Sequence, residues 1–131
     1  MNSVELIVRL IIKRGSTILL CADKENTHYF LPGGHVEFGD TLKQTIYKEM
    51  NEELGLKIEQ IFDISYNTFV EQMYINHEKK HHELCMIFNA NISENVEPVS
   101  LEDHIYFKWI DKNDIKNINL LPKAVVPLLF E

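Results

Sequence analysis

Cysteine is scarce in this sequence: only Cys21 and Cys85 occur among its 131 residues. Both lie in apolar runs, whereas small secreted scaffolds use several cysteines in paired spacings. We therefore expect two reduced, buried thiols and a cytoplasmic location. The amino-terminal segment 1–15 is largely apolar, but Glu5 and Arg9 interrupt it and no small-residue cleavage site follows, which argues against a secretory signal.

Two common phosphate-binding motifs are also missing. The sequence contains neither Gly-x-x-x-x-Gly-Lys nor Gly-x-Gly-x-x-Gly, which disfavours kinases, P-loop NTPases and Rossmann domains. No apolar run approaches the roughly 20 residues that a membrane-spanning helix needs, so we expect no membrane partner.

Positive charge is in deficit, because 13 Lys and Arg residues face 20 Asp and Glu residues and the net charge is −7. Such a protein repels nucleic acids and anionic membranes, so neither is expected as a partner. A phosphate-bearing small molecule would meet the same repulsion unless a cation intervened. With 45% hydrophobic and 25% charged residues, the chain fits one globular domain over 1–131.

Hydrophobic periodicity predicts strands at the start of the chain. The alternation from Val4 to Lys13 is typical of a strand with one fully buried face, and Thr17 to Ala22 returns as the second strand of a hairpin. A short strand from His28 to Leu31 leads into a backbone break at Pro32-Gly33-Gly34.

The clearest helix is predicted from Leu42 to Leu54. Thr41 and Gln44 form a capping box at its start, and Gly55 provides the usual stop. Apolar side chains recur at every fourth position and give one stripe for packing on a sheet.

The second half of the chain predicts further strands and a short carboxy-terminal helix. Pro127 makes that last helix less regular, since an interior proline kinks or ends a helix. The order of elements implies a mixed sheet with helices on its faces. The expected elements are strands at Gln60–Ile64, Tyr66–Tyr74, Leu84–Ile92 and Ile105–Ile110, loops at Asn76–His82 and Ser93–Leu101, and helical segments at Asp111–Ile115 and Pro122–Phe130.

Three acids, Glu49, Glu52 and Glu53, share one side of the predicted helix within an arc of roughly 100°. They repel one another at these spacings and lie near the carboxyl end of the helix, where its dipole disfavours negative charge. The preceding glycines can turn backbone carbonyls towards them. Carboxylates plus a carbonyl form an all-oxygen ligand set that suits Mg²⁺ or Mn²⁺.

The segment GGHVEFGDTLKQTIYKEMNEELGL, from Gly33 to Leu56, resembles the Nudix box. The residues that match the box at the required spacing are Gly34, Glu49, Met50, Glu52, Glu53, Gly55 and Leu56. The resemblance implies the α/β fold class, as a Nudix-type α/β/α sandwich with a mixed central sheet. It also implies that a homodimer is possible.

By the same resemblance, Glu52 and Glu53 are expected to be metal ligands, and Gly33 is expected to contribute its carbonyl oxygen. Glu49 would be a third ligand or the base that activates water. The expected cofactor is Mg²⁺ or Mn²⁺. The expected reaction is attack of water on one phosphorus of a nucleoside diphosphate derivative, with a small nucleotide as substrate.

Two positions of the box depart from the family pattern, and both are expected to influence catalysis. Asp40 replaces a Glu and is one methylene shorter, and Lys48 replaces an Arg that would orient a catalytic Glu. Lysine lacks the planar fork of arginine, so the exchange alters the hydrogen-bonding geometry.

Outside the box no fixed spacing identifies a substrate-binding residue, and surface or core roles are the simpler interpretation for each candidate. His81 and His82 are interpreted as solvated loop histidines, because neighbours on a strand point to opposite faces and do not share a metal. Candidates for an extra acid or base are Glu83, Glu102, Asp103 and His104; for phosphate contacts Arg9, Lys13, Lys79 and Lys80; and for base stacking Tyr66, Phe69, Tyr74 and Trp109.

The leading hypothesis is a metal-dependent pyrophosphohydrolase for a (deoxy)nucleoside triphosphate or another nucleoside diphosphate derivative. No proline occurs between Pro32 and Pro98, which disfavours the ADP-ribose enzymes of the family, and Tyr74 weakly matches a tyrosine of the dinucleoside polyphosphate enzymes. Two alternatives stay open: a Nudix-like nucleotide-binding or regulatory module without catalysis, and an α/β structural domain whose acidic helix is only a solvated face.

Overall fold

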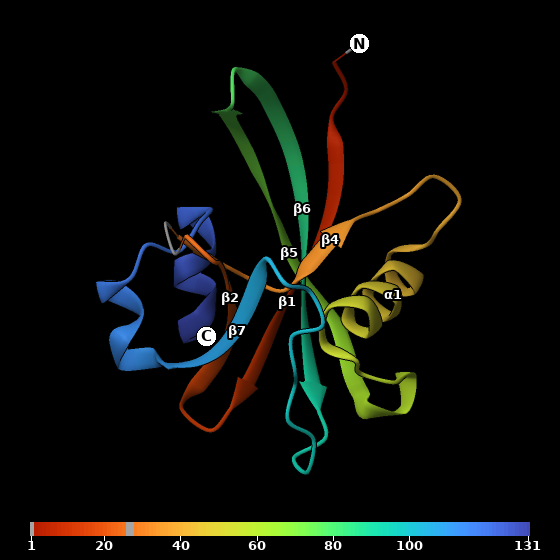
Figure 1. Cartoon of the computed structure of the whole chain (residues 1–131), viewed down its shortest axis with the longest axis vertical. Coiled ribbons are helices and arrows are strands. Elements are labelled where there is room, and N and C mark those ends of the chain that lie inside the picture. The colour runs from red at the N-terminus through yellow and green to blue at the C-terminus, as the bar shows by residue number, and fades with distance from the viewer. Residues whose placement is uncertain (1, 26–27) are drawn as a thin grey trace.

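The computed structural model of the chain describes residues 2–25 and 28–131. Among them a mixed sheet of seven strands has the order β3-β2-β1-β6-β5, with β4 paired to β1 and β7 paired to β2. Helix α1 covers one face and the carboxy-terminal helical segments cover the other (Figure 1), so the predicted α/β/α sandwich is confirmed. The strands are β1 Glu5–Arg14, β2 Thr17–Asp23, β3 Tyr29–Phe30, β4 Gly33–His35, β5 Ile61–Asn76, β6 Lys79–Ile92 and β7 Ile105–Asp111.

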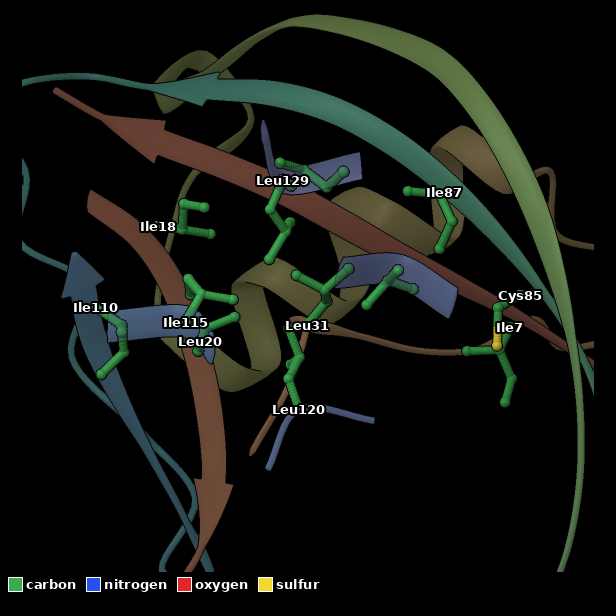
Figure 2. Packing of buried hydrophobic residues seen from close by; sticks show 12 residues of the cluster. Ile7, Ile18, Leu20, Leu31, Cys85, Ile87, Ile110, Ile115, Leu120 and Leu129 are labelled. Atoms are coloured by element: carbon green, nitrogen blue, oxygen red, sulfur yellow. The ribbon is translucent and has the colours of Figure 1, made fainter. Parts of the chain in front are cut away.

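Strand β1 lies at the centre because both of its faces are apolar. Val8 and Leu10 pack in the cluster on the α1 side, while Ile7 and Ile11 belong to the cluster on the other side. Figure 2 shows that second cluster between the sheet and the carboxy-terminal segments, where Leu129 reaches back towards the strands. The two layers fix the sheet between α1 and the chain end.

The α-helix α1 spans Leu42–Leu54, as predicted, and its capping is confirmed. The Thr41 hydroxyl accepts a hydrogen bond from the Gln44 amide, and the Thr41 amide donates to the Gln44 side chain. Gly55 ends the helix in the left-handed conformation, with φ of 66°. The capped helix therefore fixes the position of the acids at its carboxyl end relative to the sheet.

The prediction for the region after α1 was wrong in two places. The two expected strands form one strand, β5, whose pairing with β6 shifts register between Phe62 and Ser65 and between Tyr66 and Thr68. The expected loop 76–82 is only a two-residue turn at His77 and Glu78, because the polar residues that follow join the ladder of β6. Cross-strand pairing with β5 outweighs the polar composition of these residues.

The carboxy-terminal helical segments are 3₁₀ helices instead of α-helices. They are η2 Lys112–Asn117 and η3 Lys123–Phe130, and Pro127 lies inside the latter. A further 3₁₀ turn, η1 Ile58–Gln60, joins α1 to β5. Short β4 was not predicted, because the expected break at Pro32 is a bend followed directly by pairing of Gly33 with Arg9 of β1.

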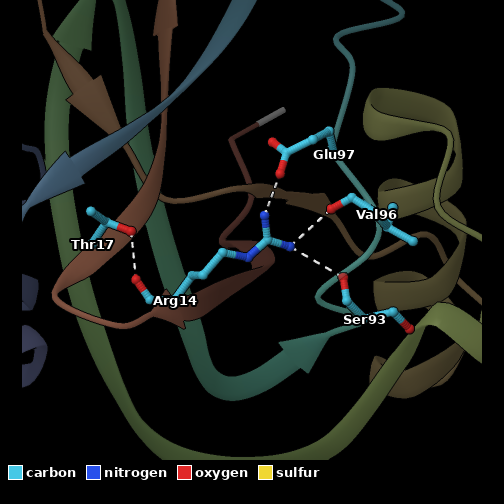
Figure 3. A network of polar contacts seen from close by, with 5 residues as sticks. All are labelled: Arg14, Thr17, Ser93, Val96 and Glu97. Atoms are coloured by element: carbon cyan, nitrogen blue, oxygen red, sulfur yellow. Dashed lines mark hydrogen bonds and ion pairs between the residues drawn. The ribbon is translucent and has the colours of Figure 1, made fainter.

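Arg14 at the end of β1 holds the loop that follows β6. Its guanidinium donates to the carbonyls of Ser93 and Val96 at 3.2 and 2.9 Å and pairs with Glu97 at 2.6 Å (Figure 3). It also lies over the Trp109 ring, 4.6 Å from the centroid. This anchor fixes the start of the loop that leads to residues 101–104.

No helix of the described part of the chain is both long enough and apolar enough to cross a membrane.

Candidate active site

The carboxyl end of α1 buries one of its acids. Glu53 is only 7% exposed, and among the described residues its Oε2 atom has no hydrogen-bond partner. Burial, with the charges of Glu49 and Glu102 in support, raises the pKa of Glu53 from an ordinary value of 4.5 to about 8. A buried carboxylate without a partner is costly, so this position favours either a bound proton or a cation.

Glu49 lies one turn earlier on the same side of α1 and is also partly shielded from solvent. Burial raises its pKa above the ordinary value, and the charges of Glu52 and Glu102 add to the effect. Glu52 itself is exposed. A carboxylate with a raised pKa is better suited than an ordinary one to accept a proton near neutral pH.

The two glycines before the helix leave space that a side chain would fill. A Cβ atom on Gly34 would lie 2.5 and 2.7 Å from the carboxylate oxygens of Glu49. On Gly33, which has φ of 154°, a Cβ atom would overlap the carbonyl of Val8. The Gly33 amide donates a hydrogen bond to the Glu53 carboxylate, which partly opposes the rise in its pKa. The glycine pair therefore brings β4 directly against both acids.

A fourth acid, Glu102, reaches this site from the loop before β7. The Leu101 amide donates to the Glu53 carbonyl at 2.9 Å, so the loop is attached to the end of α1. The charge of Glu102 raises the pKa of both Glu49 and Glu53. Glu102 was one of the candidates for an acid outside the box, and its charge acts on the helix acids; its carboxylate also lies 3.2 Å from His104.

The donor set at the end of α1 fits a hard divalent cation. It consists of carboxylates, whose oxygens Mg²⁺ and Mn²⁺ prefer, and it includes the Oε2 atom of Glu53, which has no partner among the described residues. The ligand atoms of the helix acids lie farther apart than those of an assembled metal site. Within the described residues, the group of three side chains whose ligand atoms all lie within 4.8 Å of one another is Glu5, His81 and Glu83. Mutual repulsion is expected to hold the helix carboxylates apart until a cation binds.

Lys48, on the exposed side of α1, lies near Asp40 in the segment that precedes the helix. The Lys48 ammonium is 3.2 Å from Glu37 and 4.0 Å from Asp40, and these carboxylates raise its pKa. The charge of Lys48 lowers the pKa of Glu49, which partly offsets the effect of burial. Lys48 therefore influences the neighbouring acid through its charge, while its hydrogen bond goes to Glu37.

A cavity of about 720 Å³ opens on the other side of β1. Arg9 lines it, donates to the Leu31 carbonyl at 3.1 Å and lies over the Phe30 ring, 5.5 Å from the centroid. The charge of Arg9 lowers the pKa of Glu49 and Glu53, so the cavity and the acids are electrostatically linked. The wall also includes His28, Phe30, Gln72, Tyr74, Glu83, Cys85, Leu121 and Pro122.

The sequence left the substrate-binding residues open, and only some of its candidates lie at this cavity. Arg9 and Tyr74 line it, whereas the Lys13 ammonium donates to the Glu131 carbonyl and Trp109 packs beneath Arg14. Tyr66 packs edge-on against Phe88. Phe30 and His28, whose ring centroids lie 5.7 Å apart, also line the cavity and were not among the candidates because no motif marks them.

Glu83 belongs to a different cluster from the helix acids. It accepts a hydrogen bond from the Tyr74 hydroxyl at 2.7 Å, and its near neighbours are Glu5 and His81. The interpretation of His81 and His82 as loop residues was wrong, since both lie in β6. They do point to different partners, as expected for strand neighbours: His81 contacts Glu5, and His82 contacts Glu71.

Comparisons with known proteins agree with this architecture. A MutT NUDIX hydrolase from Burkholderia pseudomallei superposes with a TM-score of 0.72 at 20% identity, covering 99% of this chain and 100% of that one. A MutT protein from Bacillus halodurans gives 0.72 at 16% identity, covering 97% and 80%. An Ap4A hydrolase from C. elegans gives 0.71 at 20% identity, covering 96% and 93%. At these identities the structural likeness establishes the fold.

The family assignment comes from the sequence itself. The model of the NUDIX domain matches residues 5–129, which includes the acidic helix, the preceding glycines and every strand of the sheet. On that match the chain belongs to the NUDIX family and is a hydrolase of phosphoric anhydrides.

Proposed function

We propose that this hydrolase is a divalent-metal-dependent nucleotide pyrophosphohydrolase acting on a (deoxy)nucleoside triphosphate. The observation that carries the proposal is the Glu53 carboxylate, which is buried with a partnerless oxygen beside Glu49 and Glu102. Such a group is costly unless a cation or proton neutralises it. A cation at this position also resolves the repulsion between a phosphate substrate and a chain of net charge −7.

In this proposal Glu52, Glu53 and the Gly33 carbonyl hold Mg²⁺ or Mn²⁺, and Glu102 supplies further negative charge. The bound ion would neutralise charge on the phosphoryl oxygens and lower the pKa of its water. Glu49 accepts the proton of the attacking water, because its raised pKa makes it a better base than an exposed carboxylate. Lys48 adjusts the basicity of Glu49 through its charge, and Asp40 helps to position Lys48.

The cavity beside Arg9 supports a nucleotide substrate. Phe30 and Tyr74 offer aromatic faces to a base, and Arg9 offers positive charge to a phosphate. The Oε1 atom of Gln72, which lines the same wall, has no partner among the described residues and can accept a hydrogen bond from a base amine.

A dinucleoside polyphosphate is the second candidate substrate. Tyr74 lines the cavity, as a base-stacking residue should, and one structural neighbour is an Ap4A hydrolase. The Tyr74 hydroxyl donates to Glu83 and one face of its ring stacks on His81, so a base would have to use the opposite face.

The cellular setting is part of the proposal. Cys21 and Cys85 are both free and buried, which suits a reducing compartment, and we place the enzyme in the cytoplasm. Exposed apolar side chains on the edge strand β5, including Phe69, Met73 and Ile75, support a homodimer. Residues 1–131 are proposed to act as a single domain.

A nucleotide panel with Mg²⁺ tests the function. Phosphate, pyrophosphate and nucleoside monophosphate release would be measured for each compound, with Glu53→Gln as the inactive variant and the exposed Glu59→Gln as its matched control. We expect metal-dependent turnover that Glu53→Gln abolishes and Glu59→Gln keeps. Tight nucleotide binding without turnover would instead establish the non-catalytic module.

A further inference from the structure

A second cluster of ligand atoms lies at the amino-terminal end of β1, away from the acids of α1. Glu5 of β1 is directly opposite Glu83 in the parallel pairing of β1 with β6, and His81 lies two residues before Glu83. Figure 1 shows this end of β1 running beside the hairpin of β5 and β6. Two carboxylates opposite each other on neighbouring strands repel, unless positive charge lies between them.

We propose that Glu5, His81 and Glu83 form a second metal site that binds a zinc-like divalent transition metal. Their ligand atoms, two carboxylate oxygens and one imidazole nitrogen, all lie within 4.8 Å of one another. His81 Nδ1 is 3.0 Å from Glu5 Oε2. Ligands bound at about 2.1 Å to one tetrahedral ion lie roughly 3.4 Å apart, so this pair already has nearly the required spacing.

The surroundings of the cluster resemble the outer shell of a metal site. The Tyr74 hydroxyl donates to Glu83 Oε2 at 2.7 Å and the Tyr74 ring stacks on His81, with centroids 4.8 Å apart. His35 of β4 contacts the other oxygen of Glu5 at 3.1 Å. Hydrogen bonds of this kind orient ligands and contribute to affinity.

The composition of the cluster selects the ion. One nitrogen and two carboxylates suit Zn²⁺ or a similar transition metal, whereas Mg²⁺ prefers oxygen alone. The ion must also displace the contact between His81 and Glu5, and only a metal with affinity for imidazole gains enough to do so. Two carboxylates, a neutral imidazole and one divalent ion would leave no net charge at a position where Glu83 is 7% exposed.

Zinc titration tests the site in a background that lacks the buried carboxylate Glu53 of α1. In the Glu53→Gln background we expect one Zn²⁺ per chain, measured by competition with a chromophoric chelator, and a Co²⁺ absorption spectrum typical of a nitrogen ligand. Adding His81→Phe keeps a ring against Tyr74 but removes the ligand, and should weaken Zn²⁺ binding at least about 100-fold. His82→Phe in the same background is the matched control and should leave Zn²⁺ binding unchanged.

A second variant distinguishes the loss of a metal ligand from misfolding. Glu5→Gln removes a ligand at the partly exposed end of β1 and should weaken Zn²⁺ binding to a similar degree, with an unchanged circular dichroism spectrum. Tyr74→Phe should weaken it by about 10–100-fold. The proposal is overturned if Glu53→Gln alone binds no Zn²⁺, or if Glu5→Gln and His81→Phe bind it as tightly as their parent.

Discussion

The acids on α1 and the cluster between β1 and β6 differ in how their negative charge is compensated. At the helix, burial raises the pKa of Glu49 and Glu53, and one oxygen of Glu53 lacks a partner among the described residues. At the strands, a hydrogen bond to His81 lowers the pKa of Glu5, and Tyr74 satisfies Glu83.

From this difference we expect the acids of α1 to depend on an ion more strongly than the strand cluster does. Burial makes Glu49 and Glu53 costly to ionise, as is typical of residues whose arrangement serves chemistry instead of stability. The strand cluster is largely satisfied by its own hydrogen bonds, so an ion there would replace existing contacts. We therefore expect activity to require a cation at α1. A cation at β1 and β6 should instead be exchangeable.

The largest expected effect comes from Glu53→Gln. Turnover should fall by at least about 1,000-fold, because a metal ligand is lost while the volume of the side chain is kept. Steady-state kinetics with saturating Mg²⁺ would measure this, and thermal unfolding without metal should show an equal or higher Tm, since a buried carboxylate has been removed. A metal-free Tm that falls by many degrees would mean that Glu53 serves the fold.

Alanine substitutions at Gly33 and Gly34 should distinguish an effect on catalysis from an effect on stability. Gly34→Ala places a methyl group against the Glu49 carboxylate and should reduce kcat by about 10–100-fold with little change in Tm. Gly33→Ala meets the backbone of Val8 in addition to requiring an unfavourable φ, so it should lower Tm markedly. Equal losses of Tm in both variants would contradict the assignment of Gly34 to the site.

Magnesium binding should depend on pH through Glu53. Folding raises its pKa to about 8, so the metal-free fold is favoured by this group below about pH 4.5 and loses that contribution as the pH rises through 8. Mg²⁺ must displace the proton, and the gain in Tm on adding Mg²⁺ should therefore be larger at pH 8.5 than at pH 6.5. In Glu53→Gln this difference should disappear; a gain that is the same at both pH values would show that Glu53 stays ionised.

The smallest effect is expected at Lys48. Lys48→Gln removes a positive charge that lowers the pKa of Glu49, so the acidic limb of the pH–rate profile should move to higher pH and kcat at neutral pH should fall by less than about tenfold. Lys43→Gln, on the exposed part of the same helix, serves as the control. A loss of 1,000-fold would show that Lys48 contacts the reacting groups directly.

Much of the fold was predictable because its signals are local. Thr41, Gln44 and Gly55 predicted both ends of α1, and the alternation from Val4 to Lys13 predicted a strand with one fully buried face. Such patterns involve residues close together in the chain, so the sequence alone shows the residues that cap the helix and the alternation of the strand. The 3₁₀ form of the chain end and the length of β6 were missed because both depend on packing and pairing with distant segments.

The sequence by itself determined the family, the acidic helix and the spacing of Glu49, Glu52 and Glu53, since these are set by the chain within one helix. Only the tertiary structure decided that Glu53 is buried, that Glu102 approaches it through the Leu101 amide, and that Glu5 meets His81 and Glu83. Those contacts join segments up to 78 positions apart, from Glu5 to Glu83, and sheet register brings them together. No local pattern encodes that register.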